Sequence, residues 1–101
     1  MSTSEKKFPF TQHNVDNSPT EDGVYALYDE NVTIYIGKGD GENGIRARLQ
    51  AHKRGDEGKC TQEASDYRRE VCNNPVTRER DLLQEYKEAH GKLPRCNEVM
   101  P

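Results

Sequence analysis

The stretch YIGKGDGENGIRARLQAH, residues 35–52, joins a strand, a glycine-rich loop and a helix. Aromatic and β-branched residues at its start are typical of a strand, and Ile45 and Leu49 at a spacing of four indicate a helix. Between them, Gly39, Gly41 and Gly44 form the pattern G-x-G-x-x-G. That pattern occurs in turns that bind dinucleotides, so the first question is whether this loop holds a nucleotide.

The surrounding sequence argues against nucleotide binding. A dinucleotide site needs a parallel strand–helix–strand unit with an acidic residue about 20 positions after the loop. A polar segment around Glu63 stands there instead of a strand end, and Asp40 and Glu42 would bring carboxylates beside the pyrophosphate. A P-loop is excluded because Lys38 is not followed by Ser or Thr and lacks the upstream glycine. The glycines are therefore predicted to provide a turn.

The composition indicates one small polar domain. The chain has 101 residues, of which 33% are charged, and its net charge is -3. Residues 38–54 nevertheless contain five basic and two acidic side chains, a local surplus that suits a polyanion but also suits a solvated helix face. No segment is long and apolar enough to span a membrane, and the N-terminus lacks the apolar region of a signal peptide, so we expect a cytoplasmic protein.

The three cysteines, Cys60, Cys72 and Cys96, are an odd number without short paired spacing. This pattern favours reduced thiols over a disulfide framework. A zinc site that also uses His52 or His90 is disfavoured because no C-x-x-C is present.

The predicted elements follow the order β-β-α-β-α. Residues 1–21 form a looser arm, and residues 22–101 form the folded domain. The domain elements are strands at 23–28 and 32–37, a helix between Asn43 and Gly55, a weak strand at 66–72, and a helix that starts at Asn74-Pro75 and stops at Gly91. We therefore predict an α+β fold with a small three-stranded antiparallel sheet flanked by helices.

The first two strands should form a hairpin that carries Tyr25 and Tyr35. A loop with an odd number of residues would place both tyrosines on one face of the sheet, and an even loop would separate them. The sequence leaves both arrangements open.

Both helices place charged residues on the faces expected to meet the sheet. In the first helix, the inward positions are Ile45, Arg48, Leu49 and His52. In the second helix, Glu79 lies on a stripe with Val76, Leu83, Tyr86 and His90. A buried glutamate is rare unless it is paired or binds a metal. A structural ion pair between Arg48 and Glu79 and an active site are equally good explanations at this point.

Five short motifs occur in a characteristic order: GVY at 23–25, YIGKG at 35–39, RLQAH at 48–52, RERDLL at 78–83 and LPRCN at 93–97. Together they resemble the GIY-YIG nuclease family over most of the chain. Val24 stands where the family most often has isoleucine, and the segment from Glu79 to Asn97 is longer than in the most compact members.

The resemblance implies metal-dependent hydrolysis of phosphodiester bonds at a single active site, with DNA as the substrate and RNA as an alternative. Glu79 would be the one carboxylate that holds Mg²⁺ or Mn²⁺, since Mg²⁺ commonly keeps several waters and binds substrate oxygens. Glu85 and Glu88 lie off the inward stripe, so Glu79 is preferred. Arg48 would stabilise charge on the phosphate in the transition state.

The resemblance also assigns roles to the two tyrosines. Tyr25 would be the general base, with Lys38 and His52 as neighbours that help it lose its proton, because an unperturbed phenol has a pKa near 10. Tyr35 would orient phosphate or water. The predicted substrate-binding residues are Lys38, Arg46, Lys53 and Asn97, and Asn97 would otherwise tie the C-terminal tail to the site.

Competing functions remain open from the sequence. The resemblance fits an endonuclease of DNA repair, recombination or restriction. A module that binds nucleic acid or protein without cutting is the main alternative. The sequence also leaves open whether a separate recognition protein supplies affinity for DNA. A small zinc or redox protein that uses the cysteines is a third. The oligomeric state is not predicted.

Overall fold

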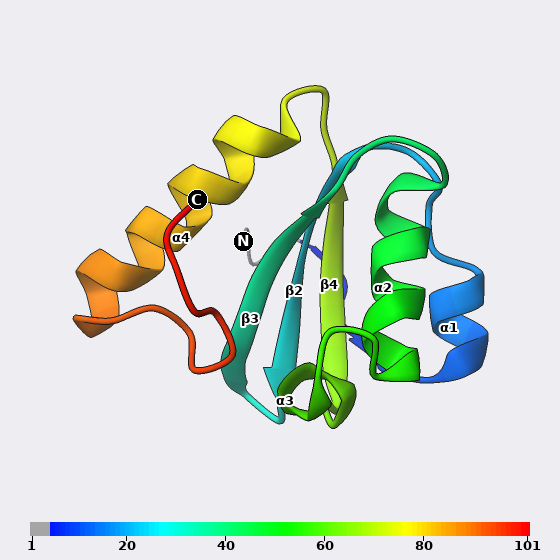
Figure 1. Cartoon of the computed structure of the whole chain (residues 1–101), viewed down its shortest axis with the longest axis horizontal. Helices are drawn as coiled ribbons and strands as arrows, with labels where there is room; N and C mark the ends of the chain where they lie inside the picture. The colour runs from blue at the N-terminus through cyan, green and yellow to red at the C-terminus, as the bar shows by residue number, and fades with distance from the viewer. Residues whose placement is uncertain (1–4) are drawn as a thin grey trace.

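The computed structural model describes residues 5–101 and shows an antiparallel sheet with helices on both faces (Figure 1). The strand order is β1-β4-β2-β3. The elements are β1 (Phe8–Pro9), α1 (Gln12–Asp16), β2 (Gly23–Asp29), β3 (Val32–Gly39), α2 (Gly44–Arg54), α3 (Lys59–Gln62), β4 (Asp66–Val71) and α4 (Pro75–His90). The α+β class and the order of the predicted elements are confirmed. The sheet has four strands rather than three because the short strand β1 pairs with β4.

Two clusters of buried side chains hold the helices to opposite faces of the sheet. Helices α1 and α2 cover one face and α4 covers the other, as Figure 1 shows. The first cluster comprises Phe10, Val15, Tyr25, Leu27, Ile34, Ile45, Leu49, Ala64 and Tyr67. The second comprises Val24, Ala26, Tyr28, Ile36, Leu82 and Leu83. Successive residues of β2 alternate between the clusters, as strand geometry requires.

The hairpin register places the two tyrosines on the same face. The loop between β2 and β3 has two residues, 30 and 31, and an even loop alone would separate Tyr25 from Tyr35. A β-bulge next to Leu27 then leaves Ile34 as an additional residue on β3, and Leu27 pairs with Tyr35. The additional residue shifts the register by one, which returns Tyr35 to the face that carries Tyr25.

The N-terminal segment is packed rather than loose over residues 8–21. Phe10 and Val15 are buried in the first cluster. Two N–H groups in the first turn of α2 donate to the carbonyls of Pro19 and Glu21, at 2.9 and 3.1 Å. The segment therefore contributes to the core and caps a helix, which its polar composition does not indicate. Residues 1–4 of the predicted arm lie outside the described residues.

Helix α2 begins after Asn43 and ends before Gly55, as predicted. The side chain of Asn43 makes no capping hydrogen bond, however, because the N-terminal segment satisfies the first amides. Gly44 has a φ of 37°, and a Cβ there would lie 2.2 Å from the carbonyl oxygen of Glu21. A glycine is needed for this close approach, so the predicted role of the loop glycines in a turn is confirmed here.

Helix α4 also has its predicted bounds, with Pro75 in its first turn and Gly91 after its end. Its predicted inward stripe is partly wrong. Glu79 and Leu83 face the sheet, but Val76 is 49% exposed and His90 is exposed, while Leu82 is buried. The middle turns of the helix contact the sheet and Pro75 is buried in the first turn, while the C-terminal turn projects into solvent (Figure 1). In the described residues, no helix has the length and apolar character needed to cross a membrane.

A disulfide joins Cys60 of α3 to Cys96 of the C-terminal tail, with their Cα atoms 5.7 Å apart. The prediction of reduced thiols is therefore wrong for these two residues. The partners are 36 positions apart in the sequence, and only the return of the tail toward α3 brings them together. Cys72 remains a free, half-buried thiol.

Candidate active site

Five of the predicted site residues line clefts at the edge of β3: Tyr35, Lys38, Arg48, Glu79 and Asn97. This strand ends the sheet, so side chains from the α2 face and from the α4 face can meet around it. Two clefts of about 410 and 550 Å³ lie there, and both are lined by Tyr35 and Glu79. Arg48 and Lys38 line one of them, and Asn97 lines the other. Helical spacing predicted that Arg48 and Glu79 face the sheet, and the family resemblance assigned their roles in the site.

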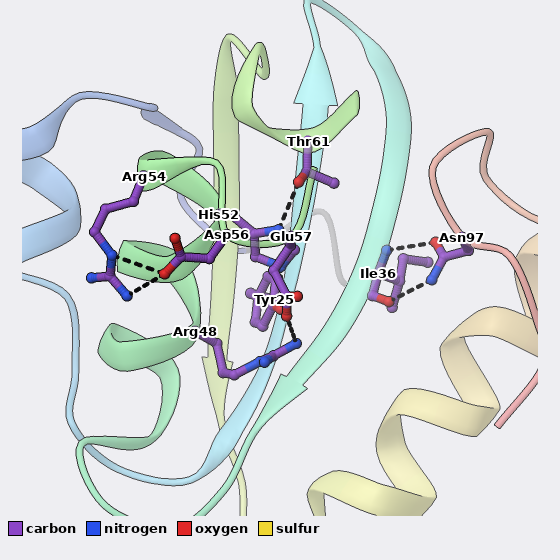
Figure 2. Close-up of polar contacts among 9 residues, drawn as sticks. All are labelled: Tyr25, Ile36, Arg48, His52, Arg54, Asp56, Glu57, Thr61 and Asn97. Carbon is purple, nitrogen blue, oxygen red and sulfur yellow. Dashed lines mark hydrogen bonds and ion pairs between the residues drawn. The ribbon is translucent and has the colours of Figure 1, made fainter. Parts of the chain in front are cut away.

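Arg48 of α2 lines one cleft, and its side chain lies beside Glu57 (Figure 2). Its Nη2 lies 2.5 Å from the Oε1 of Glu57. Among residues 5–101, Glu79 takes part in none of the ion pairs. The explanation that Arg48 and Glu79 form a structural ion pair is therefore wrong. Sequence reasoning missed Glu57, whose one signal was its position just after Gly55, where the chain reverses.

Glu79 projects from α4 beside Lys38 of β3 and is only 9% exposed. Burial raises the pKa of this carboxyl above its usual value, while the positive charges of Lys38 and Arg48 oppose the shift. The backbone N–H of Lys38 also hydrogen-bonds the carboxylate, and the Lys38 ammonium lies 3.5 Å from Asp40. Lys38 shares a sheet face with Val24, so it lies beside Glu79. The prediction that Lys38 is a neighbour of Tyr25 is therefore wrong.

The Glu79 carboxylate fits a site for a divalent cation. It is desolvated, faces a cleft and has no ion-pair partner in the described part of the chain, so a cation would offset the cost of its burial. The described residues contain no group of three or more His, Cys, Asp or Glu side chains that would form a metal cage. A hard cation bound here would depend on one carboxylate and on oxygens from water and substrate.

Behind the cleft, Tyr25, His52 and Thr61 form a buried chain of hydrogen bonds. The Oη of Tyr25 lies 2.7 Å from the Nε2 of His52, and the Nδ1 of His52 lies 2.7 Å from the Oγ1 of Thr61. Figure 2 shows the three side chains in sequence from β2 through α2 to α3. All three are buried, and Tyr25 lines neither cleft. The sequence carried no signal for Thr61.

Burial controls the ionisation of the hydrogen-bonded side chains Tyr25 and His52. Burial, assisted by the charge of Arg48, lowers the pKa of His52 to about 4, so the imidazole is neutral near pH 7. Burial also raises the pKa of Tyr25 far above its usual value, and the neighbouring Tyr35 adds to this effect. The Arg48 guanidinium opposes the shift through its charge and through a hydrogen bond to the phenol. The cationic neighbour of Tyr25 is thus Arg48 rather than Lys38.

The rings of Tyr25, Tyr35 and His52 pack against each other. The Tyr35 and His52 centroids are 4.8 Å apart in an edge contact, and the two tyrosine centroids are 6.2 Å apart. Gly37 pairs with Tyr25 across the hairpin, and a Cβ there would lie 2.5 Å from the Tyr25 Oη. A glycine at this position therefore makes room for the phenol. Tyr35 is partly exposed to the cleft, and burial raises its pKa.

Asn97 ties the C-terminal tail to β3. Its Oδ1 accepts from the N–H of Ile36, and its Nδ2 donates to the Ile36 carbonyl, both at 3.0 Å (Figure 2). The N–H of Cys96 donates to the carbonyl of Ile34 at 2.8 Å. The tail thus covers part of an edge strand. Of the two roles considered for Asn97, the contacts support the structural one.

Arg46 and Lys53 are not brought to the clefts. The Nε of Arg46 donates to the carbonyl of Ser18 at 2.7 Å, and the Nζ of Lys53 donates to the carbonyl of Phe10 at 2.9 Å. Both side chains therefore hold the N-terminal segment against α2. The prediction that they bind substrate is corrected, because it was based on the positive charge of the helix alone. The N-terminal segment that engages both side chains was not predicted to pack there.

The sheet order and the flanking helices give the chain the fold of the GIY-YIG endonuclease domain. A solved structure with this fold is the N-terminal endonuclease domain of UvrC from Thermotoga maritima bound to magnesium, which superposes with a TM-score of 0.66 at 22% identity. The match covers 86% of this chain and 94% of the UvrC domain. A point mutant of that domain superposes with a TM-score of 0.68 at 21% identity over 87% of this chain and 94% of the domain. No protein-family model and no curated protein matches the sequence.

Proposed function

We propose that this protein is a divalent-metal-dependent endonuclease that hydrolyses phosphodiester bonds in DNA. The observation that carries the proposal is the convergence of Tyr35, Lys38, Arg48 and Glu79 on clefts at one edge strand. These groups come from both faces of the sheet, and structural packing alone gives no reason to bring them together. The UvrC domain, an endonuclease domain bound to its catalytic divalent cation, supports the same reading.

Glu79 would hold Mg²⁺ or Mn²⁺ through its carboxylate. A cation at this position supplies Lewis-acid stabilisation of the phosphate charge. Lys38 lies next to Glu79 in the same cleft, where its ammonium can contact a phosphate oxygen. Its pairing with Asp40 at 3.5 Å is loose and half exposed, so substrate can compete for it.

Arg48 is the group suited to the transferred phosphate. Its guanidinium presents several donors in one plane, which matches the oxygens of a phosphate. In the structure, the Glu57 carboxylate occupies those donors. A phosphate in the cleft would replace this carboxylate, so Glu57 keeps Arg48 extended until substrate binds.

The buried chain provides a path for the proton of Tyr25. Neutral His52 can accept the proton from the Tyr25 hydroxyl through Nε2, which leaves a phenolate beside the Arg48 guanidinium. The phenolate can then take a proton from the attacking water. Because Tyr25 lines neither cleft, this step requires water to reach its hydroxyl when substrate binds.

A nuclease screen tests the proposal. The purified protein is incubated with supercoiled, branched and single-stranded DNA and with RNA, in Mg²⁺, Mn²⁺ or EDTA. We expect cleavage of DNA that requires metal and falls to background in Glu79→Ala. Glu85→Ala is the matched control, because Glu85 lies on the same helix but is exposed and outside these clefts. Absence of cleavage, or cleavage that survives Glu79→Ala, contradicts the proposal.

Two observations favour a module that binds DNA without cutting it: Tyr25 is fully buried, and Arg48 is already paired. Such a module would bind DNA tightly without metal, and Arg48→Ala would leave its affinity unchanged. A nuclease would instead bind weakly without metal, with an affinity that falls steeply as salt rises. Fluorescence anisotropy with labelled DNA in EDTA distinguishes the two.

A further inference from the structure

We propose that Thr61 is a positioning residue that fixes the tautomer of His52, so that Nε2 of the imidazole is free to accept the proton of Tyr25. This inference rests on the proposed nuclease function for its consequence in catalysis. Its structural content, the position of one proton on His52, can be measured independently of any activity.

Hydrogen-bond accounting gives the direction of each bond. An arginine side chain has donors and no acceptor, so Arg48 can only donate to the Tyr25 Oη. The remaining partner of that hydroxyl among the described residues is His52, 2.7 Å away. The hydroxyl proton therefore points to Nε2, and Nε2 is the unprotonated nitrogen. A neutral imidazole then carries its proton on Nδ1, from which it donates to the Oγ1 of Thr61.

The opposite tautomer would disable the proton path. If Thr61 donated to Nδ1, the proton of His52 would lie on Nε2 and point at the Tyr25 hydroxyl. His52 could then accept nothing from Tyr25, and the Tyr25 proton would face the guanidinium donors of Arg48. Thr61 supports the productive tautomer by accepting from the Nδ1–H of His52, and without its hydroxyl that proton would have no partner among the described residues.

The placement of Thr61 is specific rather than incidental. Its side chain is 2% exposed, and a buried hydroxyl without a partner costs free energy. The one side-chain hydrogen bond that its hydroxyl makes among the described residues is to His52. The next residue back, Cys60, is anchored to the tail by the disulfide, so α3 is held where it presents this hydroxyl. Valine would fill the same space, and only the hydroxyl would be lost.

The test combines a spectroscopic and a kinetic readout. ¹⁵N shifts of the imidazole nitrogens are measured by NMR on histidine-labelled protein, with His52→Gln to assign the signal among three histidines. We expect a proton on Nδ1 of His52 in the wild type and in Thr61→Ser. In Thr61→Val, we expect the Nε2-protonated form to appear and kcat to fall by about 10²-fold with KM unchanged. Thr61→Ser should retain most of the activity.

The control is Thr77→Val, which makes the same change at an exposed position of α4 and should alter neither readout. A wild-type protein with the proton on Nε2 overturns the proposal even if Thr61→Val fails to fold. A Thr61→Val protein with unchanged tautomer and unchanged kcat overturns it as well. If the wild type cleaves no nucleic acid, the proposed function fails, while the NMR result still decides the tautomer.

Discussion

At the scale of single residues, the site is a set of ionisable groups whose charge states are set by burial. His52 is neutral because its imidazole is fully enclosed, and Glu79 is desolvated by α4 and the sheet edge. Arg48 is the charge that reaches both the buried tyrosine and the cleft. The same guanidinium can therefore stabilise a phenolate and contact a phosphate.

The buried His52 predicts a loss of stability in acid. Its pKa is about 4 in the folded protein and near 6.5 in the unfolded chain, so between these values only the unfolded state binds the proton. The free energy of unfolding should fall as pH drops from about 7 to 4, by at most roughly 3 kcal/mol from this group. Urea unfolding at several pH values measures this effect. The free energy of unfolding of His52→Gln should change less with pH than that of the wild type. Burial raises the pKa of Glu79, so its protonation in acid favours the folded state and opposes the effect of His52. Glu79 is present in both the wild type and His52→Gln, so the comparison of the two isolates His52.

The pair between Arg48 and Glu57 predicts opposite effects of two substitutions. Glu57→Gln should release the guanidinium and lower KM for DNA, while stability changes by less than about 1 kcal/mol because the pair is partly exposed. Arg48→Ala should lower kcat by about 10²- to 10³-fold. Steady-state cleavage assays measure both. A loss of kcat in Glu57→Gln as large as in Arg48→Ala would show that Glu57 takes part in the reaction itself.

At the scale of elements, the edge strand β3 organises the site. One of its faces carries Tyr35 toward α2, the other carries Lys38 toward α4, and its edge receives the tail. An uncovered strand edge invites pairing with another chain, and the side chain of Asn97 blocks part of it. Tail and strand therefore form one unit beside the clefts.

Asn97→Ala should loosen this unit. Two hydrogen bonds to Ile36 are lost, which should reduce the free energy of unfolding by about 1–2 kcal/mol. Hydrogen exchange should show faster exchange of the Ile36 amide, since its acceptor is removed. Asn73→Ala, at an exposed position, is the control. If the Ile36 amide keeps its protection, the tail is held by its backbone and disulfide alone.

At the scale of the whole molecule, the disulfide connects parts that the sheet does not. It links α3, which carries Thr61, to the tail, which carries Asn97. A domain of about 100 residues buries a limited fraction of its surface, so one covalent link is a large share of its stability.

Removal of the disulfide should destabilise the protein. Reduction or Cys96→Ser should lower the free energy of unfolding by about 2–4 kcal/mol, because the unfolded chain regains the freedom of a long loop. Thermal unfolding with and without a dithiol reductant measures this loss of stability. Cys72→Ser removes only the free thiol, so it should still lose the same stability on reduction. A thiol titration that finds three free cysteines in the native, unreduced protein would contradict the disulfide.

Local sequence signals determined the elements of this protein. The ends of α2 and α4 were predicted from glycine, proline and asparagine, because these residues act on the adjacent turn of the helix. The strands β2 and β3 were predicted from their β-branched and aromatic residues. Spacing alone also placed Arg48 and His52 of α2 and Glu79 of α4 on inward faces. Five ordered motifs were enough to predict the fold that the structure confirms.

Contacts between distant segments were decided only by the tertiary structure. The bulge at Ile34 set the common face of the tyrosines, the N-terminal segment occupied Arg46 and Lys53, and the return of the tail formed the disulfide. Glu57 and Thr61 acquired their partners in the same way. Each of these depends on which segments pack together after the sheet forms, and helical or strand periodicity contains no information about that packing.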